Sequence, residues 1–326
     1  MFAEAIEAIL VDHCTPATLR AVESGQRAGA LIDALADSGF FDLLAAEDEG
    51  GGGATLSDLF PIAFLCGGHA VPVPLLQTIA SRLIVRTGLP PRALLTFAPS
   101  LTELDGEVRA PHVPAGTVAS HVLGQMDDQV LLFTTADAEI SVTGIHASTV
   151  ASFRWKQGVG TALEPRAGPA ELQPLAALLH AGLLAGAMKA AFDLTMQYAN
   201  DRVQFGKAIG KFQAIQHQLS VMAEHVAASS IAAEAAFAGY PLMPRTIACA
   251  AAKSRTSEAA QLVASIAHAV HGAIGVTEEY DLQLYTRRLH EWRMAHGSEM
   301  HWNSVLGAGI SSHAGSVADY VREITA

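Results

Sequence analysis

The residues with the clearest chemical potential lie between Arg202 and Met222, in the stretch R-V-Q-F-G-K-A-I-G-K-F-Q-A-I-Q-H-Q-L-S-V-M. A guanidinium is always charged and forms paired hydrogen bonds with phosphate oxygens, so Arg202 is suited to the pyrophosphate of a dinucleotide. Apolar residues recur three, four or seven positions apart in this stretch, which predicts a helix with one apolar face. Gly206 would cost that helix about 1 kcal/mol relative to alanine, which suggests that something approaches its backbone closely.

A second candidate segment runs from His271 to Arg288 and begins with a histidine followed by closely spaced glycines (H-G-A-I-G). Glycine has no side chain, so the backbone can approach a ligand closely there. On its own, a histidine at such a position is more often a satisfied core residue than a ligand.

The bulk composition indicates a folded globular protein that does not bind nucleic acid. Of the 326 residues 50% are hydrophobic and 16% are charged, which is typical of a chain with a sizeable core. The formal net charge of −12 argues against a nucleic-acid partner. The three cysteines (Cys14, Cys66, Cys249) fit neither a disulfide framework nor a zinc site, so we expect no metal and a cytoplasmic location.

We expect no membrane partner either. The N-terminus is acidic and lacks the basic start of a signal peptide. The longest apolar run, Leu175 to Phe192, is interrupted by His180 and Lys189, which favours a buried core helix over a membrane span.

Three zones follow one another along the chain. Residues 1–92 are mostly helical, residues 93–165 consist of short apolar runs typical of a small antiparallel β unit, and residues 166–326 are helical again. The four glycines in residues 47–54 predict a flexible connection, because no Gly-Lys-Ser/Thr follows them as in a phosphate loop. The expected helical stretches are 3–12, 17–37, 55–67, 172–200, 204–238 and 243–271, with a final helical pair.

The stretch from Arg202 resembles a motif of the acyl-CoA dehydrogenase family, R-x-Q-F-G-x-x-I-x-x-F-Q-x-x-Q-x-x-L, at every specified position. The order of helices, sheet and helices is also that of the family. The resemblance therefore implies a mainly α fold with a small β domain. Its parts would be an N-terminal helical domain (1–92), a reduced middle β domain (93–165) and a C-terminal four-helix bundle (166–326).

The resemblance implies FAD as the cofactor. In the family the arginine at the position of Arg202 reaches an FAD that is held mainly by a neighbouring subunit. Gln204, Phe205 and Gln213 then map onto residues around its adenosine and phosphate groups. The alternative for Arg202 is a surface salt bridge to an acidic neighbour, Asp201 or Glu224, which would contribute little.

The second segment is similar to the family's Q-x-H-G-G-x-G-x-x-x-E-x-x-x-x-x-Y-x-R-R. The resemblance implies that His271, Gly272, Ala273 and Gly275 lie beside the cofactor. Two positions depart from the pattern, because Ala269 stands where the family usually has glutamine and Ala273 replaces the second glycine. FAD binding is therefore expected to be weakened or shared. The other matching residues are Glu279, Tyr285, Arg287 and Arg288.

The carboxylate base of the family is missing from both of its usual positions. Nine residues after Arg287, where E-G-T is usual, the chain has His296 within H-G-S. The other position, thirty residues before the glycine of the first motif, is Ala176. Glu171 and Glu299 are the nearest acids, several residues away. A positioned base contributes roughly 10² to 10⁴ in rate, so its loss should nearly silence the ordinary reaction unless His296 serves instead.

The sequence therefore predicts the smaller, non-catalytic subunit of a heterotetrameric (α2β2) bacterial acyl-CoA dehydrogenase, like those of steroid side-chain degradation. A homologous larger subunit would supply the base and most of the flavin site for a bulky acyl-CoA substrate. The middle zone lacks the family's flavin-contacting segments, so this chain alone is not expected to hold the isoalloxazine. Three alternatives remain: a homo-oligomeric dehydrogenase that uses His296, a flavin monooxygenase of the same fold, and a structural homologue without flavin.

Overall fold

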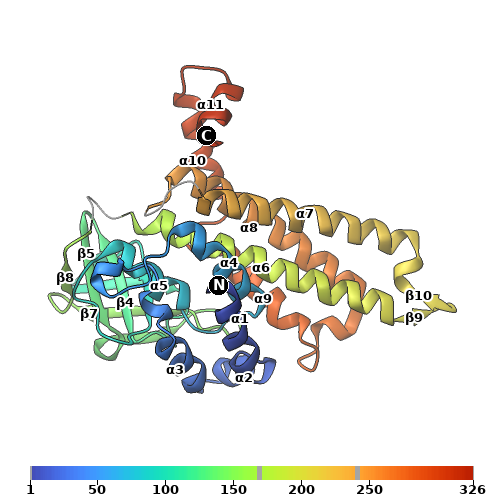
Figure 1. The fold of residues 1–326 in the computed structure, drawn as a ribbon, viewed down its shortest axis with the longest axis horizontal. Helices are drawn as coiled ribbons and strands as arrows, with labels where there is room; N and C mark the ends of the chain where they lie inside the picture. Colours follow the sequence, from blue (N-terminus) through green and yellow to red (C-terminus); the bar gives the residue numbers. More distant parts are fainter. Residues whose placement is uncertain (1, 167–170, 239–242, 326) are drawn as a thin grey trace.

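The computed structural model describes residues 2–166, 171–238 and 243–325, and it confirms a mainly helical fold with a small β region (Figure 1). The first helices pack beside the β region, and long helices form the opposite end of the molecule (Figure 1). The N-terminal helices are α1 (Phe2–His13), α2 (Pro16–Glu23), α3 (Gly29–Asp37), α4 (Leu56–Gly68) and α5 (Leu75–Ile84).

Local chemistry explains where the N-terminal helices begin and end. Thr55 and Asp58 form a capping box at the start of α4, which satisfies two backbone N–H groups. The expected stretch 17–37 is two helices, because Gly25 has a left-handed φ of +92° after the end of α2. Helix α5 was not among the expected helices.

The glycine-rich residues 47–54 form a hydrogen-bonded turn, so the expectation of a flexible connection was wrong. The Gly53 N–H donates to the Ala45 carbonyl oxygen at 2.9 Å. A Cβ at Gly51 would lie 2.3 Å from that same oxygen. The glycines are therefore required by a close approach of two backbone segments.

The β region contains two four-stranded sheets, in the orders β1-β4-β5-β8 and β2-β3-β7-β6. The expected antiparallel pattern holds except for β1 and β4, which pair in parallel (Leu95 with His121). Phe133, Phe153 and Trp155 fill the core, with ring centroids 4.5 and 5.1 Å from that of the tryptophan. The strands are β1 (Leu95–Ala98), β2 (Thr102–Leu104), β3 (Glu107–Val113), β4 (His121–Met126), β5 (Gln129–Thr134), β6 (Glu139–Val142), β7 (Ala151–Lys156) and β8 (Thr161–Leu163).

Helix α6 is the central helix of the C-terminal part and packs against α4, α7, α8 and α9. Its glycines allow a close crossing with α4, since a Cβ at Gly186 would lie 1.9 Å from the Phe64 carbonyl oxygen. The C-terminal helices are α6 (Leu172–Asp201), α7 (Gln213–Ala238), α8 (Thr246–His271), α9 (Leu282–Met294), α10 (Glu299–Ser312) and α11 (Val317–Thr325).

The expected helix over 204–238 begins only at Gln213. Before it the chain forms a short hairpin of β9 (Val203–Gln204) and β10 (Lys207–Ala208), at the far end of the long helices (Figure 1). Phe205 and Gly206 form its turn with φ of +50° and +78°, a conformation that no α-helix contains. Gly206 is therefore a turn residue with no cost to a helix, contrary to the prediction from the sequence.

Two segments are long and apolar enough to cross a membrane by length and composition, namely α6 and residues 246–276. In α6, 83% of the most apolar window is buried within the protein, as in the core helix of a folded domain. The corresponding share for residues 246–276 is 50%. Length and composition alone therefore give only weak support for a membrane span.

Candidate functional site

The two motif segments meet at the end of the long helices, where they line an open hollow of about 460 Å³. One wall comes from the end of α6 and the β9–β10 hairpin, and the other from the end of α8 and the residues after it. Of the residues predicted from the sequence, the hollow is lined by Arg202, Gln204, Phe205, His271, Gly272 and Ala273. Gln213 and Gly275 do not line it: Gln213 is exposed at the start of α7, and Gly275 is buried.

Arg202 is fixed through its backbone and free at its side chain. Its N–H donates to the Tyr198 carbonyl oxygen at 2.9 Å, and its own carbonyl oxygen accepts from the Ile209 N–H at 2.8 Å. Among the described residues the exposed guanidinium has no hydrogen-bond or ion-pair partner, so the alternative of a salt bridge to Asp201 or Glu224 is not present. The cation is therefore available to an anion from outside this chain.

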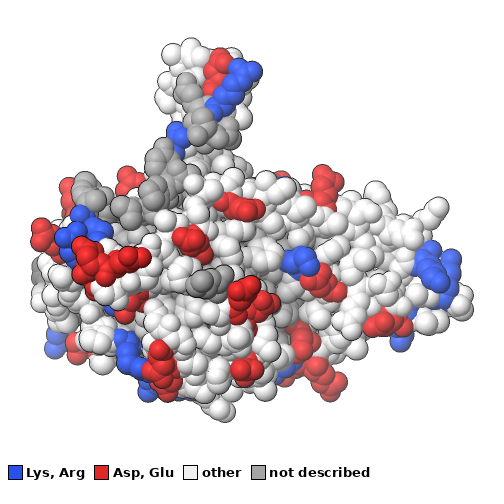
Figure 2. Space-filling view, viewed as in Figure 1, with Lys and Arg blue, Asp and Glu red and all other residues white. Residues whose placement is uncertain are grey.

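The hairpin projects an aromatic ring and positive charge. The Phe205 side chain is 89% exposed at the turn, an unusual state for so large an apolar group. Lys207 Nζ lies 4.2 Å from the centroid of the Phe212 ring, in a cation–π contact. Figure 2 shows Lys and Arg side chains at this end, and a mixture of acidic and basic side chains over the rest of that face.

His271 forms the buried floor beside the hollow. Its Nδ1 lies 2.8 Å from the Ala267 carbonyl oxygen and must carry the proton of that hydrogen bond. Burial lowers the pKa of the ring, so Nε2 is an acceptor, and it has no partner among the described residues. The ring stacks on Tyr198 with centroids 4.4 Å apart.

The glycines of the second segment have different roles. Gly272 ends α8 with φ of +65° and ψ of −144°, a conformation essentially reserved for glycine, and no heavy atom lies within 4 Å of a Cβ built there. A Cβ at Gly275 would instead lie 2.9 Å from His271 Cβ, so that glycine serves packing. Only Gly272 thus presents open backbone to the hollow.

His296 lies elsewhere, in a pocket of about 520 Å³ between the β region and α9. Both His296 and Gly297 have positive φ, +55° and +102°, which for a histidine is a strained conformation. The ring makes an edge contact with the ring of His180 (centroids 4.8 Å apart), and its buried Nε2 has no partner among the described residues. Burial, with smaller contributions from His180 and Lys253, lowers its pKa well below the ordinary value, so the ring is neutral.

Lys253, which was not among the residues predicted from the sequence, holds the segment that carries His296. Its fully buried Nζ donates to the carbonyl oxygens of Trp292, Arg293 and Gly297 at 3.1, 2.8 and 3.0 Å. Ser257 Oγ also lies 2.9 Å from Nζ, so the three N–H groups of the ammonium are shared among four acceptors. The signal available in the sequence was a single lysine inside an alanine-rich helix (A-A-K-S).

None of the acids considered from the sequence offers a free carboxylate near His296. Ala176 is buried one turn before His180, whose Nδ1 bonds its carbonyl oxygen. Glu171 accepts a hydrogen bond from Thr246, and Glu299 forms an ion pair with Arg293. Glu291, which was not among the residues predicted from the sequence, lines the same pocket as His296.

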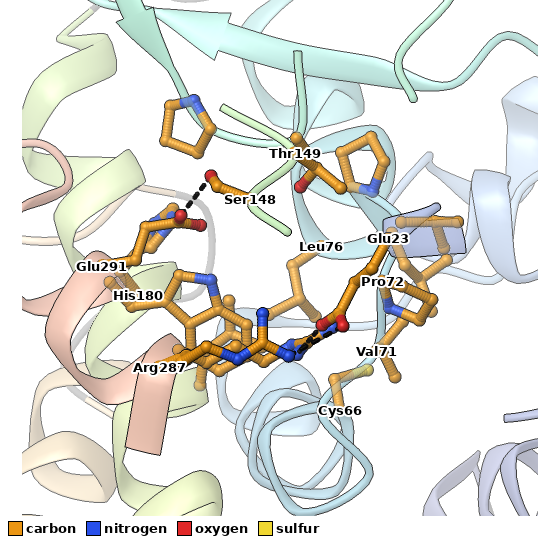
Figure 3. A pocket seen from close by; sticks show the side chains of 18 of the residues that line it. Glu23, Cys66, Val71, Pro72, Leu76, Ser148, Thr149, His180, Arg287 and Glu291 are labelled. Carbon is orange, nitrogen blue, oxygen red and sulfur yellow. Dashed lines mark hydrogen bonds and ion pairs between the residues drawn. The ribbon is translucent and has the colours of Figure 1, made fainter. Parts of the chain in front are cut away.

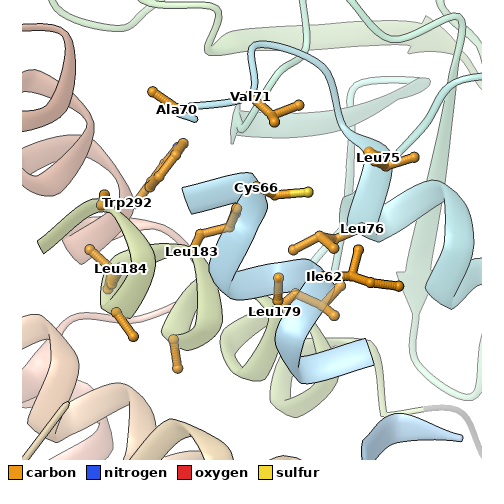
Figure 4. Close-up of a cluster of buried hydrophobic side chains, with 14 of the residues drawn as sticks. Ile62, Cys66, Ala70, Val71, Leu75, Leu76, Leu179, Leu183, Leu184 and Trp292 are labelled. Carbon is orange, nitrogen blue, oxygen red and sulfur yellow. The ribbon is translucent and has the colours of Figure 1, made fainter. Parts of the chain in front are cut away.

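A second cavity between α4, α6 and α9 is only about 50 Å³ in volume. Glu23 bridges Arg287 and Arg288 beside it, at 2.7 Å to each guanidinium, as Figure 3 shows for Arg287. Apolar side chains close the remaining space (Figure 4). They include Cys66, Leu76, Leu183 and Trp292.

Comparison with known proteins agrees with this architecture. Residues 175–308 match the family model for the acyl-CoA dehydrogenase C-terminal domain. The chain is 29% identical over 296 residues to acyl-CoA dehydrogenase IpdE2 of Mycobacterium tuberculosis, covering 89% of this chain and 90% of that protein.

Solved structures share the whole fold. A chain of the ChsE4–ChsE5 complex from Mycobacterium tuberculosis superposes with a TM-score of 0.82 at 21% identity, covering 96% of this chain and 97% of its own. A chain of the Tcur3481–Tcur3483 steroid ACAD gives 0.79 at 24% identity, with 98% and 96% covered. Residues 175–308 thus match the acyl-CoA dehydrogenase C-terminal domain, and the whole chain has the fold of these two solved structures.

Proposed function

We propose that this chain is the smaller subunit of a flavin-dependent acyl-CoA dehydrogenase complex and contributes part of an FAD site that it shares with a homologous larger subunit. The substrate would be a bulky, steroid-derived acyl-CoA. The observation that carries the proposal is the guanidinium of Arg202, unpaired among the described residues, at the edge of an open hollow. Neither position 296 nor position 176, where the family usually carries its base, holds a carboxylate.

The residues of the hollow fit the phosphate and nucleoside parts of FAD. Arg202 supplies an unpaired planar cation for phosphate oxygens, and Gln204 supplies amide donors and an acceptor. Phe205 offers an exposed ring for stacking, and Gly272 lets the ligand approach the backbone. FAD would supply the hydride acceptor of the dehydrogenation, and these residues would bind and orient it.

The small interior cavity supports a catalytic base on the larger subunit instead of on this chain. The cavity beside Glu23, Arg287 and Arg288 has room for a few water molecules only, so it cannot take a bulky acyl group. A base for α-proton removal must lie within hydrogen-bond reach of that proton. We therefore assign the base of the dehydrogenation to the larger subunit.

Two similar proteins support the choice of assembly and substrate. The ChsE4–ChsE5 structure is a complex of two named chains, and the Tcur3481–Tcur3483 protein is called a steroid ACAD. Both share the whole fold of the present chain.

A second candidate function is a self-sufficient dehydrogenase. The 520 Å³ pocket beside His296 favours it, since that volume lies within the usual range for small-molecule sites. Against it, the buried and neutral His296 ring is packed on His180 and is not presented as a free base.

The test is co-expression of this chain with a larger homologue from the same genome, followed by size-exclusion chromatography and a visible spectrum. We expect a coloured complex with about one flavin per two chains, since each unlike pair shares one site, and a colourless chain on its own. One flavin per chain with this protein alone would support the self-sufficient enzyme. A colourless complex would contradict any flavin function.

A further inference from the structure

The loop between β6 and β7 lies where three hollow spaces of the structure come together. Residues 143–149, called the flap below, line the small interior cavity, the 520 Å³ pocket and an open surface hollow of about 750 Å³ beside α2. Ile145 lines all three spaces. Figure 3 shows Ser148 across the interior cavity from Cys66. The flap is therefore a shared wall between the interior cavity and two outer spaces.

The flap has little apolar surface in the core. None of residues 143–149, all of which the structure describes, is buried, and the Ile145 side chain is 52% exposed. Segments with little buried apolar surface open at a lower free-energy cost than the core around them. Ala147 has a positive φ of +59°, which adds strain to the closed loop. The flap is therefore the part of this wall that can open while the helices stay folded.

Hydrogen bonds to α9 hold the flap closed. Ser148 Oγ donates to Oε2 of the half-buried Glu291, as Figure 3 shows. Arg287 Nη1 donates to the His146 carbonyl oxygen at 3.2 Å. A further contact joins His146 Nε2 to Glu278 at 3.7 Å, but these side chains are 85% and 87% exposed and their pairing contributes little. The bond to the Glu291 carboxylate is the strongest of these contacts, because it is charge-assisted and shielded from water.

The closed flap also requires a glycine at position 144. A Cβ at Gly144 would lie 2.0 Å from Ser148 Oγ and 2.3 Å from Ser148 Cβ, which is closer than such atoms can come. Gly144 has no positive φ, so the close approach alone excludes a larger residue. Rotation of the serine hydroxyl would not relieve the contact with its Cβ. A side chain at position 144 must therefore move Ser148 away from Glu291.

We propose that residues 143–149 are a gate between the interior cavity and the surface, held shut by the hydrogen bond from Ser148 to Glu291. Opening joins the interior cavity to the outer spaces and uncovers Cys66, which is 1% exposed in the closed form. The gate admits small uncharged molecules, because a charged one would lose its hydration among the apolar side chains inside.

The gate is independent of the FAD site proposed at Arg202. Its opening moves a loop of the β region and leaves the packing of α4, α6 and α9 as it is. The interior cavity therefore stays too small for a bulky acyl group, and the base of the dehydrogenation remains assigned to the larger subunit.

The test measures how fast Cys66 reacts with N-ethylmaleimide, a small uncharged thiol reagent. It uses the full chain, alone and in the complex with the larger homologue, and peptide mass spectrometry gives a separate rate for each cysteine. Cys249 is 0% exposed in α8 and does not line the cavity, so it reports opening of the whole fold. We expect Cys66 to react at least about tenfold faster than Cys249, because local opening requires less free energy than global unfolding.

Two variants weaken the closed state by different means. Ser148→Ala removes the hydrogen bond to Glu291, and Gly144→Ala displaces the serine. Each should raise the Cys66 rate about ten- to hundredfold, the effect of one lost hydrogen bond to a charged group, and leave the Cys249 rate unchanged. Ser220→Ala is the matched control, because that hydroxyl bonds only within the exposed face of α7 and should leave both rates unchanged.

Each outcome decides the proposal. Equal rates at Cys66 and Cys249 in the unaltered chain would overturn it, as would Cys66 rates in both flap variants that match the rate in Ser220→Ala. If one flap variant fails to fold, the other decides. A colourless complex whose Cys66 still reacts faster would contradict the proposed FAD function and support the gate. A flavin-containing complex and a free chain that both lack this difference would contradict only the gate.

Discussion

The arginines of the two motif segments are in opposite electrostatic states. Arg202 has an exposed guanidinium with no ionic partner among the described residues. Arg287 and Arg288, in the other segment, share Glu23 at 2.7 Å each, and that carboxylate is only 7% exposed. The contrast shows which surface can bind a partner's anion and which is already neutralised within the chain.

The hollow at Arg202 and the interior cavity beside Glu23 differ in the same way. The hollow at Arg202 is open and presents unpaired groups, whereas the interior cavity beside Glu23 is nearly filled and its charges are satisfied. A buried ion pair is expensive to separate, while a solvated cation costs little to keep. Binding at the hollow is therefore not limited by the breaking of existing ion pairs.

The largest expected effect is the loss of unfolding free energy in Glu23→Ala. The substitution leaves the buried Arg288 and the partly exposed Arg287 without their shared anion, and loss of one partner from a buried pair typically costs 3–5 kcal/mol of unfolding free energy. Urea denaturation would measure the change. Asp281→Asn is the control, because its pair with Arg20 is much more exposed and should contribute at most about 1 kcal/mol. Equal losses in both variants would contradict the assignment of a buried network.

A smaller effect, and on binding instead of folding, should follow from Arg202→Ala. Loss of a charged hydrogen bond costs about 1.5–3 kcal/mol, roughly a ten- to hundredfold loss of FAD retention by the complex. The free energy of unfolding should change little, because the guanidinium has no partner among the described residues. Flavin release during dialysis would measure retention. Lys211→Ala, an exposed cation outside the hollow, should retain the flavin. Unchanged retention in Arg202→Ala would remove the central claim.

Lys253 should make the free energy of unfolding depend on pH. Burial lowers the pKa of its ammonium group from 10.5 to about 7, so the charged form is less favoured in the folded chain than in the unfolded chain. The unfolded chain then binds more protons above pH 7, and stability must rise as the pH increases. From pH 7 to pH 9 this group alone should add about 2 kcal/mol to the free energy of unfolding. Lys253→Met should abolish that increment in urea titrations, and an identical pH dependence in both proteins would refute the assignment.

The helical zones and the meeting of the two motifs were predictable from the sequence. The alanine-rich sequence identified the long helix that ends at Asp201, and the family motif linked the next residue, Arg202, to His271, which lines the same hollow. The β9–β10 hairpin was missed because apolar spacing at Phe205 and Phe212 imitates a helix, whereas their backbone geometry does not. Periodicity cannot report a positive φ at a non-glycine residue.

The long-range contacts of Glu23 and Glu291 could not be predicted in the same way. Glu23 and Arg288 are 265 residues apart, and nothing in either local sequence indicates their ion pair. Glu291 and Ser148 likewise meet only because a loop of the β region packs on α9. Such contacts depend on how the elements pack together, which local patterns do not encode.

The smallest expected effect is on FAD retention in Ala273→Gly. This substitution restores the glycine that the family usually has at this position. Ala273 is exposed and follows Gly272, whose backbone already opens the hollow. Removal of its methyl group should therefore change FAD retention by less than about threefold, or roughly 0.6 kcal/mol. Flavin release from the complex would measure it beside Arg202→Ala. A gain near tenfold would mean that the methyl group obstructs the cofactor, and that the hollow is less open to its ligand than Arg202 alone indicates.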